Sequence, residues 1–150
     1  MAIVHEKRFL PFPPDFLFNL VSDVEKYPQF LPWCRNVRIT KHLADSFIAD
    51  MIVGFKSIRQ GFTSRVFSGS KQEFVRVELV KGPFNHLDTL WKFQAETEDE
   101  VKGTLVDFKV DFAIKSRVLA VVLEPLFAEA QRRIVAAFEK RAYELHEAAA

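Results

Sequence analysis

Histidine, cysteine and paired carboxylates most often perform chemistry in proteins, and this sequence holds few of them. Its four histidines (His5, His42, His86 and His146) lie far apart, without the spacing of metal ligands. Cys34 is the only cysteine and has no histidine near it in the sequence, which favours a buried or half-buried thiol over a nucleophile. We therefore predict no metal site, no disulfide and no catalytic cysteine.

Motifs of phosphate binding and nucleophilic catalysis are also absent. The chain has no Gly-x-Gly-x-x-Gly, no phosphate-binding glycine-rich loop, no Gly-x-Ser-x-Gly and no His-Glu-x-x-His. Asp107 and Asp111 fall on one face of a predicted strand whose other face is apolar, so we expect both to point to solvent. We predict no catalytic residues.

The strongest local signal is apolar and runs from Tyr27 to Cys34, with the sequence Tyr-Pro-Gln-Phe-Leu-Pro-Trp-Cys. Proline fixes φ and removes a donor, so neither a long helix nor a central strand runs through this segment. So much apolar surface on an irregular segment must be covered by other residues or by a ligand. The segment either plugs the core or lines an opening into it.

The elements before this segment are one strand and two short helices. A strand is expected over 2–10, and a helix follows the prolines at 11–14, with Asp15 in its first turn. Apolar residues from Phe16 to Val24 recur at intervals of three and four residues, which is typical of an amphipathic helix. The spacing Ser22-Asp23-Val24-Glu25 predicts a capping box and a second short helix, which Tyr27-Pro28 ends or kinks.

After Trp33, apolar residues recur at every second position. Alternation predicts six strands joined by short turns, at about 37–40, 47–56, 62–67, 74–79, 87–94 and 106–112. The acidic run 96–100 is expected to be a solvated hairpin turn. The six strands form an antiparallel meander that is apolar on one face and charged on the other.

From 116 to 147 the apolar period is 3.6, which predicts a helix about 45 Å long that could cross the whole sheet. Pro125 should kink or divide it. The predicted fold is α+β: a curved antiparallel sheet wrapped around a long C-terminal helix, in the order β-α-α-β6-α, as a single domain over 1–150.

Charge excludes some partners. The formal net charge is +1, from 21 basic and 20 acidic residues, so there is no global nucleic-acid footprint and no DNA partner is expected. Arg132, Arg133, Lys140 and Arg141 give the last helix a basic side. This side is either a solvated face or a contact for an anionic surface, such as lipid headgroups or RNA.

Cellular location is predicted from three features. The single cysteine fits a reducing compartment, and charges at 6–8 interrupt any secretory signal. No apolar run approaches the length that spans a bilayer. We expect a cytoplasmic protein that can act at the surface of the inner membrane.

A strongly bent sheet closed by one helix leaves a gap, and the 16 phenylalanines suggest an apolar lining. The mouth is expected where the segment 27–34 meets the turn Gly82-Pro83-Phe84. A solid core is the commoner outcome for such a pattern and remains the alternative. We predict mouth residues Tyr27, Phe30, Leu31, Pro32, Trp33 and Phe84, and lining residues Val53, Phe62, Trp91, Phe93, Phe108, Phe127, Ile134 and Phe138.

The segment from Tyr27 to Cys34 closely resembles the signature of the coenzyme Q-binding branch of the START-domain (polyketide cyclase/dehydrase-like) superfamily. The later pieces Gly82-Pro83-Phe84-x-x-Leu87, Trp91-x-Phe93 and Ala137-Phe138-Glu139-x-Arg141-Ala142 agree in order. The resemblance implies the helix-grip fold and no enzyme activity. Mitochondrial members bind ubiquinone and support respiration, and bacterial members include ribosome-association toxins. A chain that starts at its first strand looks like a bacterial or processed form.

Three functions follow as hypotheses. The leading one is a carrier or chaperone of ubiquinone, or of a similar apolar lipid, that supports respiratory electron transport and touches the inner membrane transiently; the Tyr27 hydroxyl could bind a quinone oxygen. The alternative is a regulator that binds the large ribosomal subunit through the basic side of the last helix. An enzyme of the cyclase type ranks last, because it needs polar groups inside the cavity and the candidates are few: Gln60, Ser64, Thr89 and Thr104.

Overall fold

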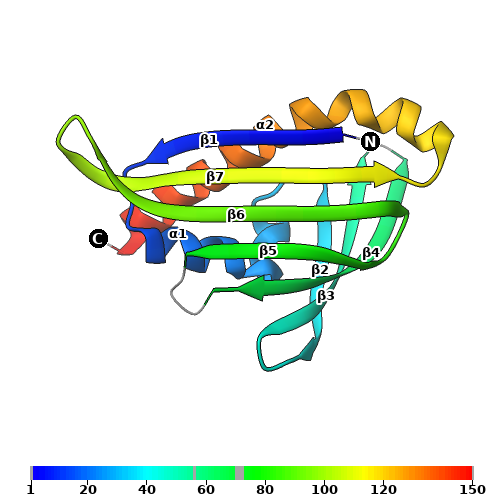
Figure 1. Cartoon of the computed structure of the whole chain (residues 1–150), viewed down its shortest axis with the longest axis horizontal. Helices are drawn as coiled ribbons and strands as arrows, with labels where there is room; N and C mark the ends of the chain where they lie inside the picture. Colours follow the sequence, from blue (N-terminus) through cyan, green and yellow to red (C-terminus); the bar gives the residue numbers. More distant parts are fainter. Residues whose placement is uncertain (1, 56, 70–72, 150) are drawn as a thin grey trace.

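The computed structural model describes residues 2–55, 57–69 and 73–149, and they form seven strands, two α-helices and one 3-10 helix (Figure 1). This confirms the predicted α+β fold and its element order. The elements are β1 (Ala2–Leu10), α1 (Pro14–Ser22), η1 (Val24–Gln29), β2 (Cys34–His42), β3 (Ser46–Phe55), β4 (Ile58–Ser68), β5 (Phe74–Lys81), β6 (Phe84–Glu98), β7 (Val101–Ile114) and α2 (Arg117–Ala149).

All seven strands belong to one antiparallel sheet with the order β1-β7-β6-β5-β4-β3-β2. Strands β2 to β7 form the predicted meander. The place of β1 does not follow from alternation: it returns to pair with the last strand, from Ala2 opposite Phe112 to Leu10 opposite Thr104. Figure 1 shows β1 (blue) beside β7 (yellow), so the first and last strands of the chain are neighbours in the sheet.

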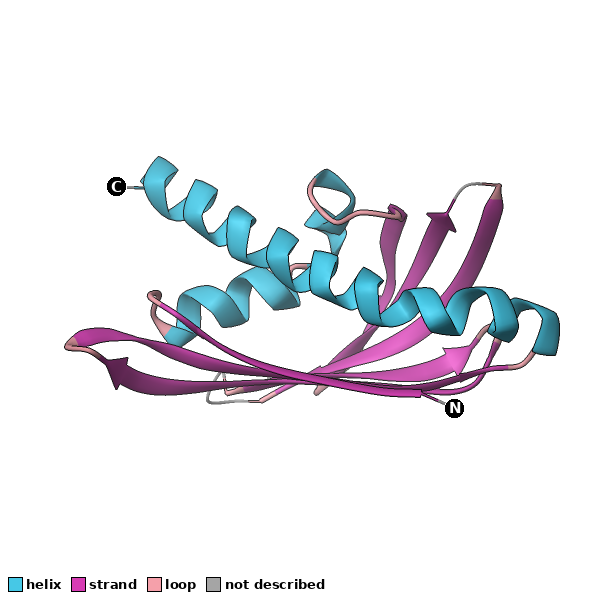
Figure 2. Cartoon of the chain, turned by 90° about the horizontal axis from the view of Figure 1, so that it is seen from above, coloured by secondary structure: helices cyan, strands magenta, loops and turns pink. Residues whose placement is uncertain are grey.

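The sheet is bent, and all the helices lie on its concave side (Figure 2). Pairing shifts by a residue at several places, including between Cys34 and Asn36 in β2 and between Thr63 and Ser64 in β4. Such bulges bend a strand and increase its twist. The bend turns β2, β3 and β4 toward α2, which gives the concave face the depth that a cavity needs.

The short helices differ from the prediction in detail. Helix α1 begins at Pro14 with Asp15 in its first turn, as expected. The capping box at Ser22 is wrong, because the Ser22 hydroxyl donates back to the Asn19 carbonyl at 3.3 Å. The next element is the 3-10 helix η1, and Pro28 lies inside it instead of ending it. A short 3-10 helix can accommodate this proline, because proline lacks an amide N–H and few amides in so short an element need a helical hydrogen-bond partner.

Helix α2 is continuous through Pro125, so the expected division does not occur. Proline removes one helical hydrogen bond, and the carbonyl it leaves belongs to the exposed Val121, where water can bind it. The helix packs mainly through its second half. Val118 and Val121 near its start are each 76% exposed, whereas the buried positions among its described side chains are Gln131, Val135, Phe138 and Ala142.

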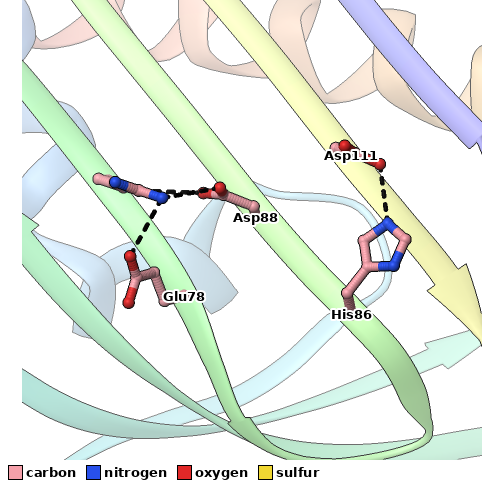
Figure 3. Close-up of polar contacts among 5 residues, drawn as sticks. Glu78, His86, Asp88 and Asp111 are labelled. Carbon is pink, nitrogen blue, oxygen red and sulfur yellow. Dashed lines mark hydrogen bonds and ion pairs between the residues drawn. The ribbon is translucent and has the colours of Figure 1, made fainter.

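The convex face of the sheet is polar, as alternation predicts. Arg76 donates to Asp88 through two nitrogens at 2.9 and 3.2 Å and contacts Glu78 at 3.2 Å (Figure 3). His86 contacts Asp111 at 2.8 Å on the same face. Asp107 likewise pairs with His5 at 2.5 Å. The two aspartates therefore serve the solvated face of the sheet.

The acidic run at 96–100 is mostly strand, which corrects the predicted turn. Strand β6 continues to Glu98, and the hairpin turn is formed by Asp99 and Glu100 at φ 48° and 67°. Alternation could not show this, because acidic residues are tolerated on a strand whose two faces both meet solvent.

Gly103 on β7 leaves no room for a side chain. A Cβ there would overlap the Leu10 carbonyl oxygen and lie 2.7 Å from the Phe9 ring. We expect Gly103→Ala to lower the free energy of unfolding by about 1–3 kcal/mol. In the control Gly61→Ala the new Cβ has its nearest neighbour at 3.9 Å, so stability should change by less than about 1 kcal/mol. Thermal melts of both variants test this, and equal melting temperatures would contradict it.

Candidate functional site

A cavity of about 420 Å³ lies between the concave face of the sheet and α2. The alternative of a solid core is therefore wrong. Its walls are mainly apolar and come from β2 to β7, η1, the segment before β2, and one side of α2. Among lining residues that the sequence did not single out as ligand contacts are Val24, Val37, Ala49, Met51, Val66, Val77, Leu87, Val110, Phe112, Ile114, Leu119 and Ala130.

Most residues predicted for the mouth and lining do line this cavity, although contact with a ligand stays a prediction for each of them. The Phe127 side chain lies outside the described part of the structure. The predicted residues in the walls are Tyr27, Leu31, Pro32, Trp33, Val53, Phe62, Phe84, Trp91, Phe108, Ile134 and Phe138.

Two predicted residues, Phe93 and Phe30, are placed elsewhere. Phe93 is buried between Trp91, at 6.3 Å between ring centroids, and Phe18 of α1, at 6.1 Å. The alternation of side chains along the strand placed Phe93 on the correct face of the sheet. It could not show that α1 covers that end of the face. Phe30 packs its ring against Phe138 and lies under the guanidinium of Arg141, at 5.4 Å.

Phe138 joins the helix to the other parts of the site. Its ring makes edge contacts with Trp91 on the sheet at 5.0 Å, and with Tyr27 and Phe30 at 5.3 and 5.2 Å. Trp91 in turn stacks on Phe108 at 4.0 Å. Edge-to-face and stacked aromatic pairs contribute about 0.5–1.5 kcal/mol each beyond their burial. The segment 27–34 is thus fixed in place at the side of the cavity.

The Tyr27 hydroxyl is not available to a ligand, which corrects the sequence hypothesis. It donates to the carbonyl of Val21, at the end of α1. Burial raises the pKa of Tyr27 far above its ordinary value, and the charges of Cys34 and Asp23 act in the same direction. The hydroxyl therefore stays protonated and ties the segment to α1, while the ring faces the cavity.

Trp33 has a left-handed backbone, at φ 65°, which is uncommon for an aromatic residue. Its carbonyl accepts a hydrogen bond from the Gly54 amide at 2.8 Å, and the guanidinium of Arg133 lies 5.9 Å from its ring centroid. A conformation that costs about 1–3 kcal/mol persists only where its surroundings fix it. The result is that the half-buried indole stands in the cavity wall next to α2.

Cys34 is a buried thiol, as predicted, and it lines the cavity. Burial raises its pKa to about 11, so it stays neutral at physiological pH. A neutral thiol is a poor nucleophile and a poor metal ligand. It acts here as a small apolar part of the wall.

Three of the four polar candidates line the cavity: Gln60, Ser64 and Thr89. The fourth, Thr104, does not; it is fully buried and donates to the Phe12 carbonyl at 2.7 Å. The sequence analysis missed Gln131, which lines the cavity, is 2% exposed and has no hydrogen-bond partner for either amide atom within the described chain. The sequence feature that could have indicated this residue is a glutamine one turn before Ile134, within the apolar stripe of α2.

The described residues contain neither a cluster of metal ligands nor a helix that could span a membrane. Within residues 2–55, 57–69 and 73–149, no three histidine, cysteine or acidic side chains gather in a way that could hold a metal ion. Neither of the described α-helices is long and apolar enough to cross a membrane.

Comparisons with known proteins agree with this geometry. The ribosome association toxin RatA of Rickettsia prowazekii is 31% identical over 97% of this chain and 99% of its own. The coenzyme Q-binding protein COQ10 homolog B of Xenopus laevis is 30% identical over 91% of this chain and 56% of its own. The solution structure of an 18 kDa protein from Caulobacter crescentus is 34% identical, covers 98% of this chain and 99% of its own, and has a TM-score of 0.78.

The sequence model of one family, described as polyketide cyclase/dehydrase and lipid transport, matches residues 10–139. That range contains the segment 27–34 and all the described walls of the cavity. The chain therefore belongs to this START-like family of polyketide cyclases, dehydrases and lipid transport proteins.

Proposed function

We propose that this protein binds an apolar lipid with a ring headgroup, such as ubiquinone, in the cavity beneath α2. The cavity carries the proposal: its 420 Å³ falls in the range of small-molecule sites, and its walls are largely aliphatic and aromatic. Each buried CH₂ contributes roughly 0.8 kcal/mol. About ten of them would give near-micromolar affinity before ordering costs reduce it.

A binding role fits the lining better than a catalytic one. General acid–base catalysis needs a pKa close to the working pH. Among the described lining residues, Tyr27 and Cys34 have raised pKa values, and Glu129 and Arg133 pair with each other at 3.1 Å. We therefore propose that the protein is not an enzyme.

A long isoprenoid tail exceeds the cavity, so part of it would remain outside. The start of α2 offers a place for this. Val118, Val121 and Val122 are exposed there, Leu119 between them lines the cavity, and Lys115 and Arg117 precede them. Apolar residues beside cations suit an anionic membrane surface. We propose that this end of α2 touches the inner membrane while lipid enters or leaves.

The comparisons favour a ribosomal role over the respiratory role that the sequence analysis ranked first. Ribosome association toxins match this chain almost end to end, whereas the Xenopus coenzyme Q-binding protein is matched over about half its length. We propose that the protein acts in the cytoplasm as a regulator that contacts the large ribosomal subunit. Lipid binding and ribosome contact use different surfaces, so one chain can do both.

The basic side of α2 is smaller than the sequence indicates. Arg133 lies by Trp33 and pairs with Glu129, and Arg141 donates to Gln29 at 2.9 Å over the ring of Phe30. Arg132 and Lys140 are exposed and lie about 12 Å apart along the helix. We propose these two as the ribosomal RNA contact.

Lipid binding is tested first by native mass spectrometry of protein purified without detergent, followed by lipid extraction of any adduct. We expect an adduct that added ubiquinone displaces. Protein that carries no lipid and also takes up no ubiquinone would refute the carrier function.

Mouth substitutions should separate binding from folding. We expect Leu31→Ser and Trp33→Ala to weaken ubiquinone binding about tenfold or more, while the melting temperature falls by only a few degrees, because both side chains are half-buried in the cavity wall. Val101→Ser, which removes an apolar side chain at the exposed β6–β7 hairpin, should leave binding unchanged. Parallel loss of binding and stability would show that the segment is only a core plug.

Cys34 should report on cavity occupancy. With its pKa raised from 9.0 to about 11, iodoacetamide should alkylate the native thiol about 100-fold more slowly than the unfolded chain at pH 8. Bound decylubiquinone should slow it further. Since the unfolded thiol ionises first, the free energy of unfolding should fall between pH 9 and 11, and Cys34→Ala should remove that part of the fall. An alkylation profile with an apparent pKa near 9 would contradict this.

Ribosome contact should depend on charge at α2. We expect Arg132→Glu with Lys140→Glu to weaken cosedimentation with the large subunit and to reduce the slope of log affinity against log salt by about 2. The control is Lys92→Glu with Lys109→Glu, an equal charge change at exposed positions of β6 and β7. Equal losses in both double variants would mean that net charge, and not this side of α2, governs the contact.

A further inference from the structure

Among the described residues, four polar side chains are buried, and three of them have an evident role. Thr63 donates to Asp50 at 2.6 Å, Thr104 donates to the Phe12 carbonyl, and Ser64 lies in the cavity wall on β4. Gln131 differs from these. It is 2% exposed, and neither its amide nitrogen nor its amide oxygen has a hydrogen-bond partner among the described residues.

An unpartnered buried amide is costly and rare, because folding strips it of water without replacing the lost hydrogen bonds. Apolar residues surround this one on α2: Ile134 lies three positions on, Val135 four and Phe138 seven. A leucine or methionine would fill the same place without the cost. The described residues provide no partner for this amide, which points to a partner from outside the chain.

The position of Gln131 limits what that partner can be. The side chain belongs to the α2 wall of the cavity, and the sheet wall carries the hydroxyl groups of Ser64 and Thr89. A primary amide offers two N–H donors and one carbonyl acceptor. An apolar molecule that carries a carbonyl or hydroxyl oxygen on its ring can satisfy these groups, whereas a plain hydrocarbon cannot.

We propose that Gln131 is the specificity-determining residue of the cavity, and that it hydrogen-bonds a ring carbonyl or hydroxyl oxygen of the bound lipid. This rests on the proposed lipid binding and adds to it a ligand class: oxygen-bearing ring lipids over hydrocarbons of the same shape. The apolar walls hold the ligand by burial, and Gln131 selects for the polar head.

The test uses the full chain, two probes and two variants. Decylubiquinone carries ring oxygens, and phenyldecane carries the same decyl chain on a ring without oxygen. Gln131→Met removes the amide at nearly constant volume. Ile134→Met is the matched control, because it places the same side chain on the same wall of the cavity. Affinity for both probes and the melting temperature of the ligand-free protein are measured.

We expect Gln131→Met to weaken decylubiquinone binding about 2- to 10-fold and to change phenyldecane binding by less than about twofold. Without ligand, Gln131→Met should melt at the same temperature or a few degrees higher, since an unpartnered amide is removed. Ile134→Met should shift both probes alike.

Several results would overturn the proposal. Equal changes for both probes in Gln131→Met would mean that the side chain acts by shape alone, and unchanged decylubiquinone affinity would mean that it makes no ligand contact. A larger fall in melting temperature than in Ile134→Met would mean that the amide has a structural partner. If wild-type protein binds phenyldecane and decylubiquinone equally well, lipid binding stands and this inference fails; if it binds neither, both fail.

Discussion

The packing of the Phe138 ring is the contact on which the rest of this structure depends. Its ring meets Trp91 on the sheet and the rings of Tyr27 and Phe30 in the segment before β2. One side chain thus joins three parts of the chain that are distant in sequence. Arg133 and Arg141 of α2 also contact this segment, at Trp33 and at Gln29 and Phe30, but only Phe138 among these three also reaches the sheet through an aromatic contact that the structure describes.

The cavity exists because α2 packs closely over only part of its length. Among the side chains of α2 that the structure describes, the buried ones are Gln131, Val135, Phe138 and Ala142, and the helix contacts β1, β7 and α1. Toward its N-terminus the helix passes above a sheet that bends toward it, and Val118 and Val121 face solvent (Figure 2). The curvature of the sheet beneath α2 accounts for close packing at one end of the helix and separation at the other.

The polar groups of the cavity divide into two kinds. Tyr27 and Cys34 stay neutral, because burial raises the pKa of each, and they behave as parts of an apolar wall. Gln131 has no hydrogen-bond partner among the described residues, and the α2 residues one and two turns after it, Ile134, Val135 and Phe138, are apolar. Among the described residues the Arg141 Nε is the other buried side-chain atom without a partner, and Arg141 does not line the cavity. One unpaired amide in a largely apolar wall is what a site needs if it is to hold a ligand by burial and to select it by one hydrogen bond.

Local periodicity decided the secondary structure of this protein, since alternation at two and at 3.6 depends only on which residues must be buried. Strands β2 to β7, the helix α2 and part of the cavity wall followed from it, as did the polar role of Asp107 and Asp111. Tertiary structure alone decided the pairing of β1 with β7, the cover that α1 gives to Phe93, the hydrogen bond from Tyr27 to Val21 and the empty space beneath α2. A pattern shows which face of an element is buried. It cannot show what covers that face, because the cover comes from residues far away in the sequence.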